Sequence, residues 1–119
     1  MRVVTWNPMS TTGNRLIEFD MNMKKESVVI LSGTQMRERW GRSSEKCGLE
    51  HFHGTLFGHA PGKYTNKSTG GAILLNKKKF KEENIVAVEV PGKELRGRGG
   101  CIRYKSRHYD LLTLPTCSA

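Results

Sequence analysis

The sequence has few cysteines, and they lie far apart. Cys47, Cys101 and Cys117 are an odd number at wide spacing in 119 residues, whereas small secreted domains carry paired cysteines at close spacing. No run approaches the roughly 18 to 20 consecutive apolar residues of a membrane span, and the N-terminus lacks the basic and apolar regions of a signal peptide. We therefore expect reduced thiols, no contact with a membrane, and a nuclear or cytoplasmic rather than a secreted protein.

Acidic residues are scarce relative to basic ones. The chain has 20 Lys and Arg against 11 Asp and Glu, which gives a formal net charge of +9 at pH 7. Twelve of the basic residues but only four of the acidic ones fall between Lys63 and Arg107, so this segment carries +8 and the remainder only +1. Such an excess favours a polyanionic partner, because each phosphate that is neutralised releases condensed counterions. The competing interpretation is a solvated lysine-rich face that only keeps the protein soluble.

The first third of the sequence has the pattern of a strand, a helix and a second strand. Residues 2–6 are β-prone and end at Asn7-Pro8, which predicts a buried first strand with Trp6 in the core. Residues 15–25 follow a polar capping stretch, repeat apolar side chains at helical spacing, and end in lysines that suit the last turn of a helix. Residues 28–31 predict a second buried strand. This order predicts a right-handed parallel crossover.

The remaining two thirds predict strands without a further helix. Residues 36–67 are polar and interrupted by glycines, which indicates a long loop with at most a short strand. Apolar runs at 71–76, 85–90, 100–105 and 109–114 predict four more strands, for which an antiparallel meander is the simplest topology. The sequence therefore predicts a single α+β domain over residues 1–119, with one mixed sheet of about five or six strands and one main helix.

Four of these segments, in this order and spacing, resemble a known family. VVTWN at 3–7, VVIL at 28–31, GGAILL at 70–75 and LRGRGG at 95–100 resemble the N-terminal half of the endonuclease/exonuclease/phosphatase family, of the apurinic-endonuclease type. GTQ at 33–35 and YTNKSTG at 64–70 are similar to the endonuclease domain of non-LTR retrotransposon reverse transcriptases. The resemblance implies a partial sandwich of the family type, covering about half of a domain that normally packs two sheets between helices.

The resemblance also implies a Mg²⁺-dependent phosphodiesterase site, of which this sequence carries one residue. Asn7 matches the asparagine that orients the attacking water and the scissile phosphate in the family, although an asparagine before Pro8 is also a common turn residue. Gly33 stands where the family has its Mg²⁺-binding glutamate, and glycine offers no oxygen ligand. The other catalytic residues of the family are expected beyond residue 119. The resemblance thus predicts a truncated, inactive endonuclease-like domain that binds no Mg²⁺ tightly.

Basic residues of the second half are the candidate contacts with nucleic acid. Arg103, Lys105 and Arg107 alternate along a predicted strand and therefore share one face. Arg96 and Arg98 flank a glycine in a predicted tight turn. The resemblance makes DNA the favoured partner, and the competing interpretation leaves each side chain merely solvated. The candidate set is Lys67, Arg96, Arg98, Arg103, Lys105 and Arg107.

Zinc is a less favoured interpretation of the histidines and cysteines. Cys47, His51 and His53 are close in sequence, with His59, Cys101 or Cys117 as remote partners. Structural zinc sites usually pair their ligands in two close doublets, which this spacing does not match.

Two function classes remain open from the sequence. The chain is either an inactive relative of a DNA-cleaving nuclease or a non-catalytic basic module that holds phosphates without reading bases. Half of a two-sheet sandwich leaves an apolar sheet face uncovered, so we also expect self-association through that face.

Overall fold

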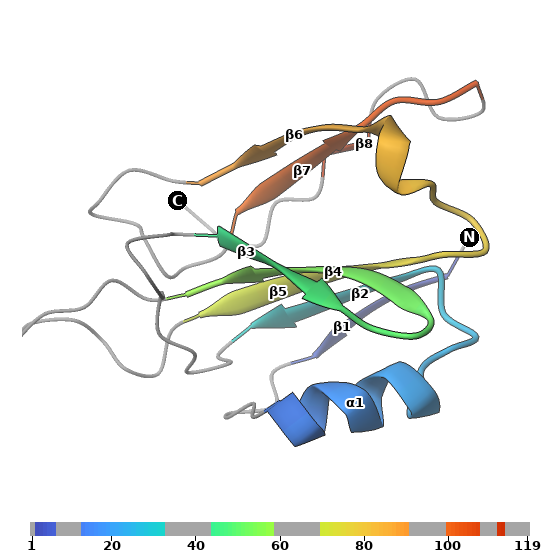
Figure 1. Ribbon diagram of the computed structural model, residues 1–119, viewed down its shortest axis with the longest axis vertical. Coiled ribbons are helices and arrows are strands. Elements are labelled where there is room, and N and C mark those ends of the chain that lie inside the picture. The colour runs from blue at the N-terminus through green and yellow to red at the C-terminus, as the bar shows by residue number, and fades with distance from the viewer. Residues whose placement is uncertain are drawn as a thin grey trace, which may run out of the picture.

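The computed structural model describes residues 2–6, 13–32, 44–58, 70–90, 100–107 and 112–113. These residues form one helix, a five-stranded sheet and a three-stranded sheet, which lie in three layers with the larger sheet in the middle (Figure 1). The α+β class predicted from the sequence is confirmed. The single mixed sheet of five or six strands is corrected, because the last three strands form a sheet of their own.

The larger sheet contains the strands of the first two thirds of the chain. Its strands are β1 (Val3–Trp6), β2 (Val28–Ser32), β3 (Ser44–Gly48), β4 (Phe52–Phe57) and β5 (Gly71–Asn76), in the spatial order β1-β2-β5-β4-β3. β1 and β2 are parallel and are connected through helix α1 (Gly13–Asn22), as the strand, helix, strand pattern predicts. The other pairings are antiparallel, so the sheet is mixed.

Both faces of the larger sheet are covered, which explains the nearly continuous apolar runs of β2 and β5. On one face, Leu16 and Phe19 of α1 pack in a core cluster with Val29 and Leu74. On the other face, side chains that alternate with these, including Ile73 and Leu75, pack against the smaller sheet. Every residue of β5 is buried.

The last three predicted strands form an antiparallel meander as predicted, whereas the strand at 71–76 belongs to the larger sheet. The smaller sheet contains β6 (Ile85–Glu89), β7 (Cys101–Tyr104) and β8 (Leu112–Thr113) in that order, and a short 3-10 helix η1 (Glu82–Asn84) precedes it. Ile102 and Tyr104 carry its contact with the larger sheet. Over the described residues, the second face of the larger sheet, which we expected to be uncovered, thus packs against the smaller sheet. Self-association stays a prediction, but an uncovered sheet face no longer supports it.

The first strand was predicted to be buried, but its side chains are largely exposed. Val3 is 51% exposed and Trp6 is 46% exposed, because β1 is the edge strand of its sheet and has a neighbour on one side only. The Trp6 ring lies on the Phe19 ring of α1 with centroids 5.6 Å apart, so it flanks the core rather than filling it.

Two further expectations are corrected. The long loop predicted over 36–67 contains β3 and β4, which pair as a hairpin, and β4 lies inside the sheet next to β5. Helix α1 ends at Asn22, so Lys24 and Lys25 fall in the turn that follows rather than in the last helical turn. The described helix is neither long nor apolar enough to cross a membrane.

Candidate nucleic-acid interface

The structure describes half of the candidate nucleic-acid contacts. Arg103, Lys105 and Arg107 belong to or directly follow β7. The other three candidates, together with Asn7 and Gly33, lie outside the described residues; these three are Lys67, Arg96 and Arg98.

The three described candidates are exposed, but only Arg103 lies within β7, so one strand face shared by all three stays a prediction. Ile102, which precedes Arg103, and Tyr104, which follows it, are buried against the larger sheet. The period of two along a strand produces this separation. We call Arg103, Lys105 and Arg107 the β7 stripe.

Arg103 of the β7 stripe and its neighbour Tyr104 each make a contact that bears on how the stripe could bind a phosphate. Arg103 Nη1 lies 3.5 Å from Glu89 Oε1, and both side chains are about half exposed, so part of the Arg103 charge is already matched by a carboxylate. The Tyr104 hydroxyl accepts a hydrogen bond from the backbone N–H of Lys81 at 2.9 Å. This bond fixes the start of η1 against β7.

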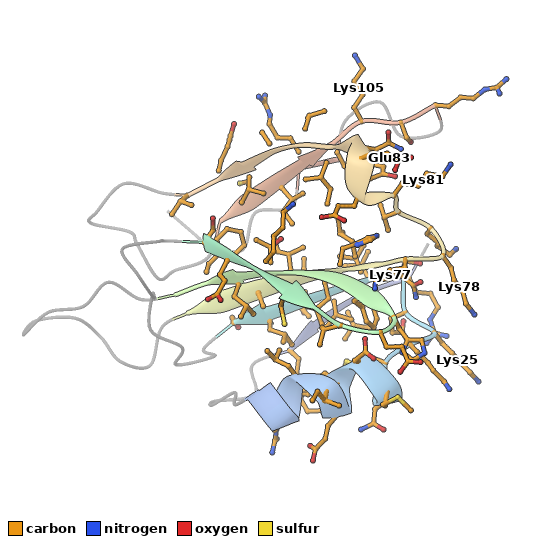
Figure 2. All side chains as sticks on the ribbon, viewed as in Figure 1. Lys25, Lys77, Lys78, Lys81, Glu83 and Lys105 are labelled. Atoms are coloured by element: carbon orange, nitrogen blue, oxygen red, sulfur yellow. The ribbon has the colours of Figure 1, made fainter. Side chains whose placement is uncertain are left out.

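A second basic surface, which sequence reasoning missed, lies at one end of the larger sheet. Its residues come from the turn after α1 and from the turn after β5, and all are exposed: Lys24, Lys25, Lys77, Lys78 and Lys79. We call this surface the lysine edge. Figure 2 shows Lys25, Lys77 and Lys78 at the same edge of the molecule, with Lys81 and Glu83 above them and Lys105 at the far end of the smaller sheet.

Asn76 joins the two turns that carry the lysine edge. Its side chain is only 4% exposed, and its Nδ2 donates to the carbonyls of Lys24 (2.9 Å) and Glu26 (2.7 Å). Its Oδ1 accepts from the backbone N–H of Lys78 at 2.9 Å. One buried amide therefore sets the position of two turns about fifty residues apart in sequence.

A third turn, between β3 and β4, is attached to the same end of the sheet. Lys77 Nζ donates to the Leu49 carbonyl at 2.6 Å, and Lys77 N donates to the His51 carbonyl at 2.9 Å. Asp20 of α1 accepts from the backbone N–H of His51 through Oδ1 and from His51 Nδ1 through Oδ2, both at 2.8 Å. Hydrogen bonds thus connect the two turns of the lysine edge with each other and with the β3–β4 turn.

Asp20, Glu50 and His51 are the one group of three potential metal ligands within the described residues, with ligand atoms inside 4.8 Å of one another. Both oxygens of the buried Asp20 are already occupied by His51, so the carboxylate fastens the turn. The contacts between Asp20 and His51 therefore have a structural role, because they link α1 to the β3–β4 turn.

Two of the candidate zinc ligands, Cys47 and His53, lie on opposite faces of the larger sheet. Cys47 packs against the cluster on the helix side, whereas His53 Nε2 donates to the carbonyl of Phe80 at 3.2 Å on the side of the smaller sheet. Burial raises the pKa of the Cys47 thiol, and the nearby carboxylates of Glu45 and Asp20 raise it further.

Comparison with known proteins assigns no family. No family model, curated protein or solved structure matches this chain. Function is therefore inferred from the residues and their geometry.

A cleft of about 380 Å³ lies between the hairpin of β3 and β4 and strand β6. Its wall combines aliphatic side chains such as Ile85 and Val88 with polar groups of His53 and Thr55. Lys46 Nζ and Glu82 Oε1, also in the wall, form an ion pair at 3.0 Å, and this hydrogen bond and charge lower the pKa of Glu82. These charges satisfy each other, so the cleft presents less unmatched charge than the two basic surfaces.

The two basic surfaces can bind phosphate but supply little else. The lysines of the lysine edge act as point charges without the planar fork that arginine offers to a base edge, and of the two arginines of the β7 stripe Arg103 already faces Glu89. Such surfaces suit contacts with a phosphate backbone rather than the reading of bases.

Proposed function

We propose that this chain binds nucleic acid, with DNA as the favoured partner, and does not cleave it. The observation that carries the proposal is the gathering of five exposed lysines of the lysine edge on two neighbouring turns at one end of the larger sheet (Figure 2). The resemblance to the nuclease family supports DNA and accounts for the sandwich-like layers. The formal net charge of +9 supports a polyanionic partner.

The proposal of binding without catalysis rests on the residues available for the chemistry. Hydrolysis of a phosphodiester in the family manner needs carboxylate oxygens that hold Mg²⁺ beside the scissile phosphate. Gly33 stands at the position of the family glutamate and has no side-chain oxygen. Asp20 and Glu50 do not replace it, because they lie at the other end of the larger sheet. Asp20 precedes β2 and Glu50 precedes β4, whereas Gly33 follows the C-terminal end of β2 in the sequence.

Binding is expected to weaken steeply with salt. For four to six phosphates neutralised, the affinity for a DNA duplex should fall roughly 10²- to 10³-fold between about 50 and about 200 mM salt. Fluorescence anisotropy with two labelled duplexes of unrelated sequence measures this, and both duplexes should give the same affinity. Absence of binding at the lower salt concentration, or an affinity that does not respond to salt, contradicts the proposal.

Cleavage is not expected. The purified protein with Mg²⁺ should cut abasic, nicked or supercoiled DNA no faster than an Asn7→Ala variant prepared in the same way. Gel analysis of supercoiled plasmid measures this at the sensitivity of a single nick. Metal-dependent cutting that disappears in the Asn7→Ala variant would show that the chain is an active nuclease.

A further inference from the structure

The lysine edge lies away from the place where the family resemblance puts the catalytic residue. Asn7 and Gly33 follow the C-terminal ends of the parallel strands β1 and β2. Lys24 and Lys25 precede β2, and the triplet 77–79 follows β5, which is antiparallel to β2 with Val28 opposite Leu75. The lysine edge therefore lies at the end of the larger sheet opposite to the C-terminal ends of β1 and β2.

The turns that carry the lysine edge are held before any ligand arrives. Asn76 bonds to the backbone of both turns, and backbone N–H groups of Lys79 and Phe80 donate to the Asn76 carbonyl at 3.0 and 2.9 Å. A binding surface on a fixed backbone loses only side-chain freedom when a ligand binds, which favours affinity.

The charge of the lysine edge is only partly offset by its surroundings. Glu26 is matched by Arg2, whose Nη2 lies 3.0 Å from Glu26 Oε1. Counting Asp20 of α1 and Glu50 of the β3–β4 turn against the five lysines leaves a surplus of three positive charges. Within the described residues, Lys24, Lys25, Lys78 and Lys79 form no ion pair with a carboxylate.

We propose that the lysine edge is the principal contact of this chain with the phosphate backbone of duplex DNA, and that the β7 stripe is secondary. This inference rests on the proposed function and assigns the binding of DNA to one surface of the chain. The β7 stripe has fewer charges, and one of them, Arg103, faces Glu89. Every lysine of the edge is exposed, and Lys78 and Lys79 stand on the turn that Asn76 fixes.

A DNA backbone suits the lysine edge better than an anionic membrane surface. Surface binding to a bilayer combines basic residues with apolar side chains that enter the headgroup region. The turn after β5 presents three consecutive lysines, and the next apolar residue, Phe80, is fully buried and points into the core. The exposed Met21 is on α1 rather than on this turn.

The inference is tested with two variants that remove equal charge from different surfaces. The edge variant is K24Q/K25Q/K78Q/K79Q, and Lys77 is left in place because its amine bonds to Leu49. The matched control is K81Q/R103Q/K105Q/R107Q, which removes four positive charges from the region of the smaller sheet. Anisotropy with a labelled DNA duplex of about 20 base pairs measures affinity over a range of salt. Circular dichroism melts verify that each variant is folded.

We expect the edge variant to bind DNA roughly 100-fold more weakly at low salt and to lose about three to four from its salt slope, whereas the control should lose less than about 5-fold. Each pair alone, K24Q/K25Q or K78Q/K79Q, should weaken binding about 10-fold, so the test does not depend on folding of the quadruple variant.

Three outcomes overturn the inference. If the unaltered protein does not bind DNA, the proposed function and this inference fail together. If it binds and the edge variant retains its affinity while the control does not, the inference fails and the proposed function stands. If vesicles of phosphatidylcholine and phosphatidylserine bind more tightly than DNA, and the edge variant abolishes only that binding, the lysine edge is a membrane-binding surface.

Discussion

Replacing Gly100 with alanine is expected to lower the free energy of unfolding by about 3 kcal/mol, near the upper end of the range for overpacked cores. A Cβ at this position would lie 2.6 Å from Cδ1 of the Phe57 ring, closer still to Cε1, and 2.8 Å from the backbone oxygen of Glu89. Phe57 is 1% exposed and lies in the cluster between the two sheets, so its ring has little room to move. The Glu89 oxygen belongs to the β6–β7 pairing and cannot withdraw without disrupting it.

Two other glycines provide graded controls for Gly100→Ala. A Cβ at Gly54 would lie 3.1 to 3.2 Å from Cys47 and Leu74, contacts that small shifts of side chains relieve in part, so Gly54→Ala should cost about 1 kcal/mol. A Cβ at Gly48 meets nothing within 4 Å, and Gly48→Ala should change stability by less than about 0.5 kcal/mol. Urea denaturation of the three variants measures the series. Equal stability of Gly100→Ala and Gly48→Ala would mean that the smaller sheet does not pack on Phe57 as described.

The strands at the centre of the fold were predictable because their sequence carries a local signal. Residues 28–31 and 72–75 are uninterrupted apolar runs, which a strand covered on both faces requires. The parallel pairing of β1 with β2 follows from the single helix between them. The exposure of Arg103 between the buried Ile102 and Tyr104 was also predictable, since alternation along a strand assigns its two faces directly.

The hairpin of β3 and β4 could not be predicted from local pattern. Gly54 in the middle of β4 has low strand propensity, and the polar, glycine-containing sequence around it is typical of a loop. Gly54 and Thr55 are buried because β5 pairs alongside, with Gly54 opposite Leu74 and Thr55 opposite Ile73. That pairing joins segments about twenty residues apart, and tertiary context overrides propensity.

The lysine edge was missed for a related reason. The triplet 77–79 is visible in the sequence, but nothing local shows that Lys24 and Lys25 lie beside it. The link is the Asn76 side chain, and an asparagine at the end of an apolar run reads simply as a turn residue. A buried asparagine directly before a basic triplet is the signal to look for, although burial itself has to come from a structure.

Asn76→Ala is expected to destabilise the protein by about 3 kcal/mol, since three hydrogen bonds at roughly 1 kcal/mol each are lost. The change leaves the carbonyls of Lys24 and Glu26 and the backbone N–H of Lys78 without their partner at a part-buried position. It also removes the connection between the turns on either side of the lysine edge. The melting temperature should fall by roughly 10 °C or more, as followed by circular dichroism.

Asn84→Ala is the matched control for Asn76→Ala, because Asn84 is a half-buried asparagine whose side chain makes one long hydrogen bond, Nδ2 to the Tyr104 hydroxyl at 3.4 Å. Its cost should stay below about 1 kcal/mol. Hydrogen exchange then distinguishes a local from a general effect, since the amide of Lys78 should lose protection in Asn76→Ala and keep it in Asn84→Ala. If both variants are equally stable and Lys78 remains protected, Asn76 does not hold the two turns together, and the lysine edge lacks the fixed backbone on which its proposed affinity for phosphate depends.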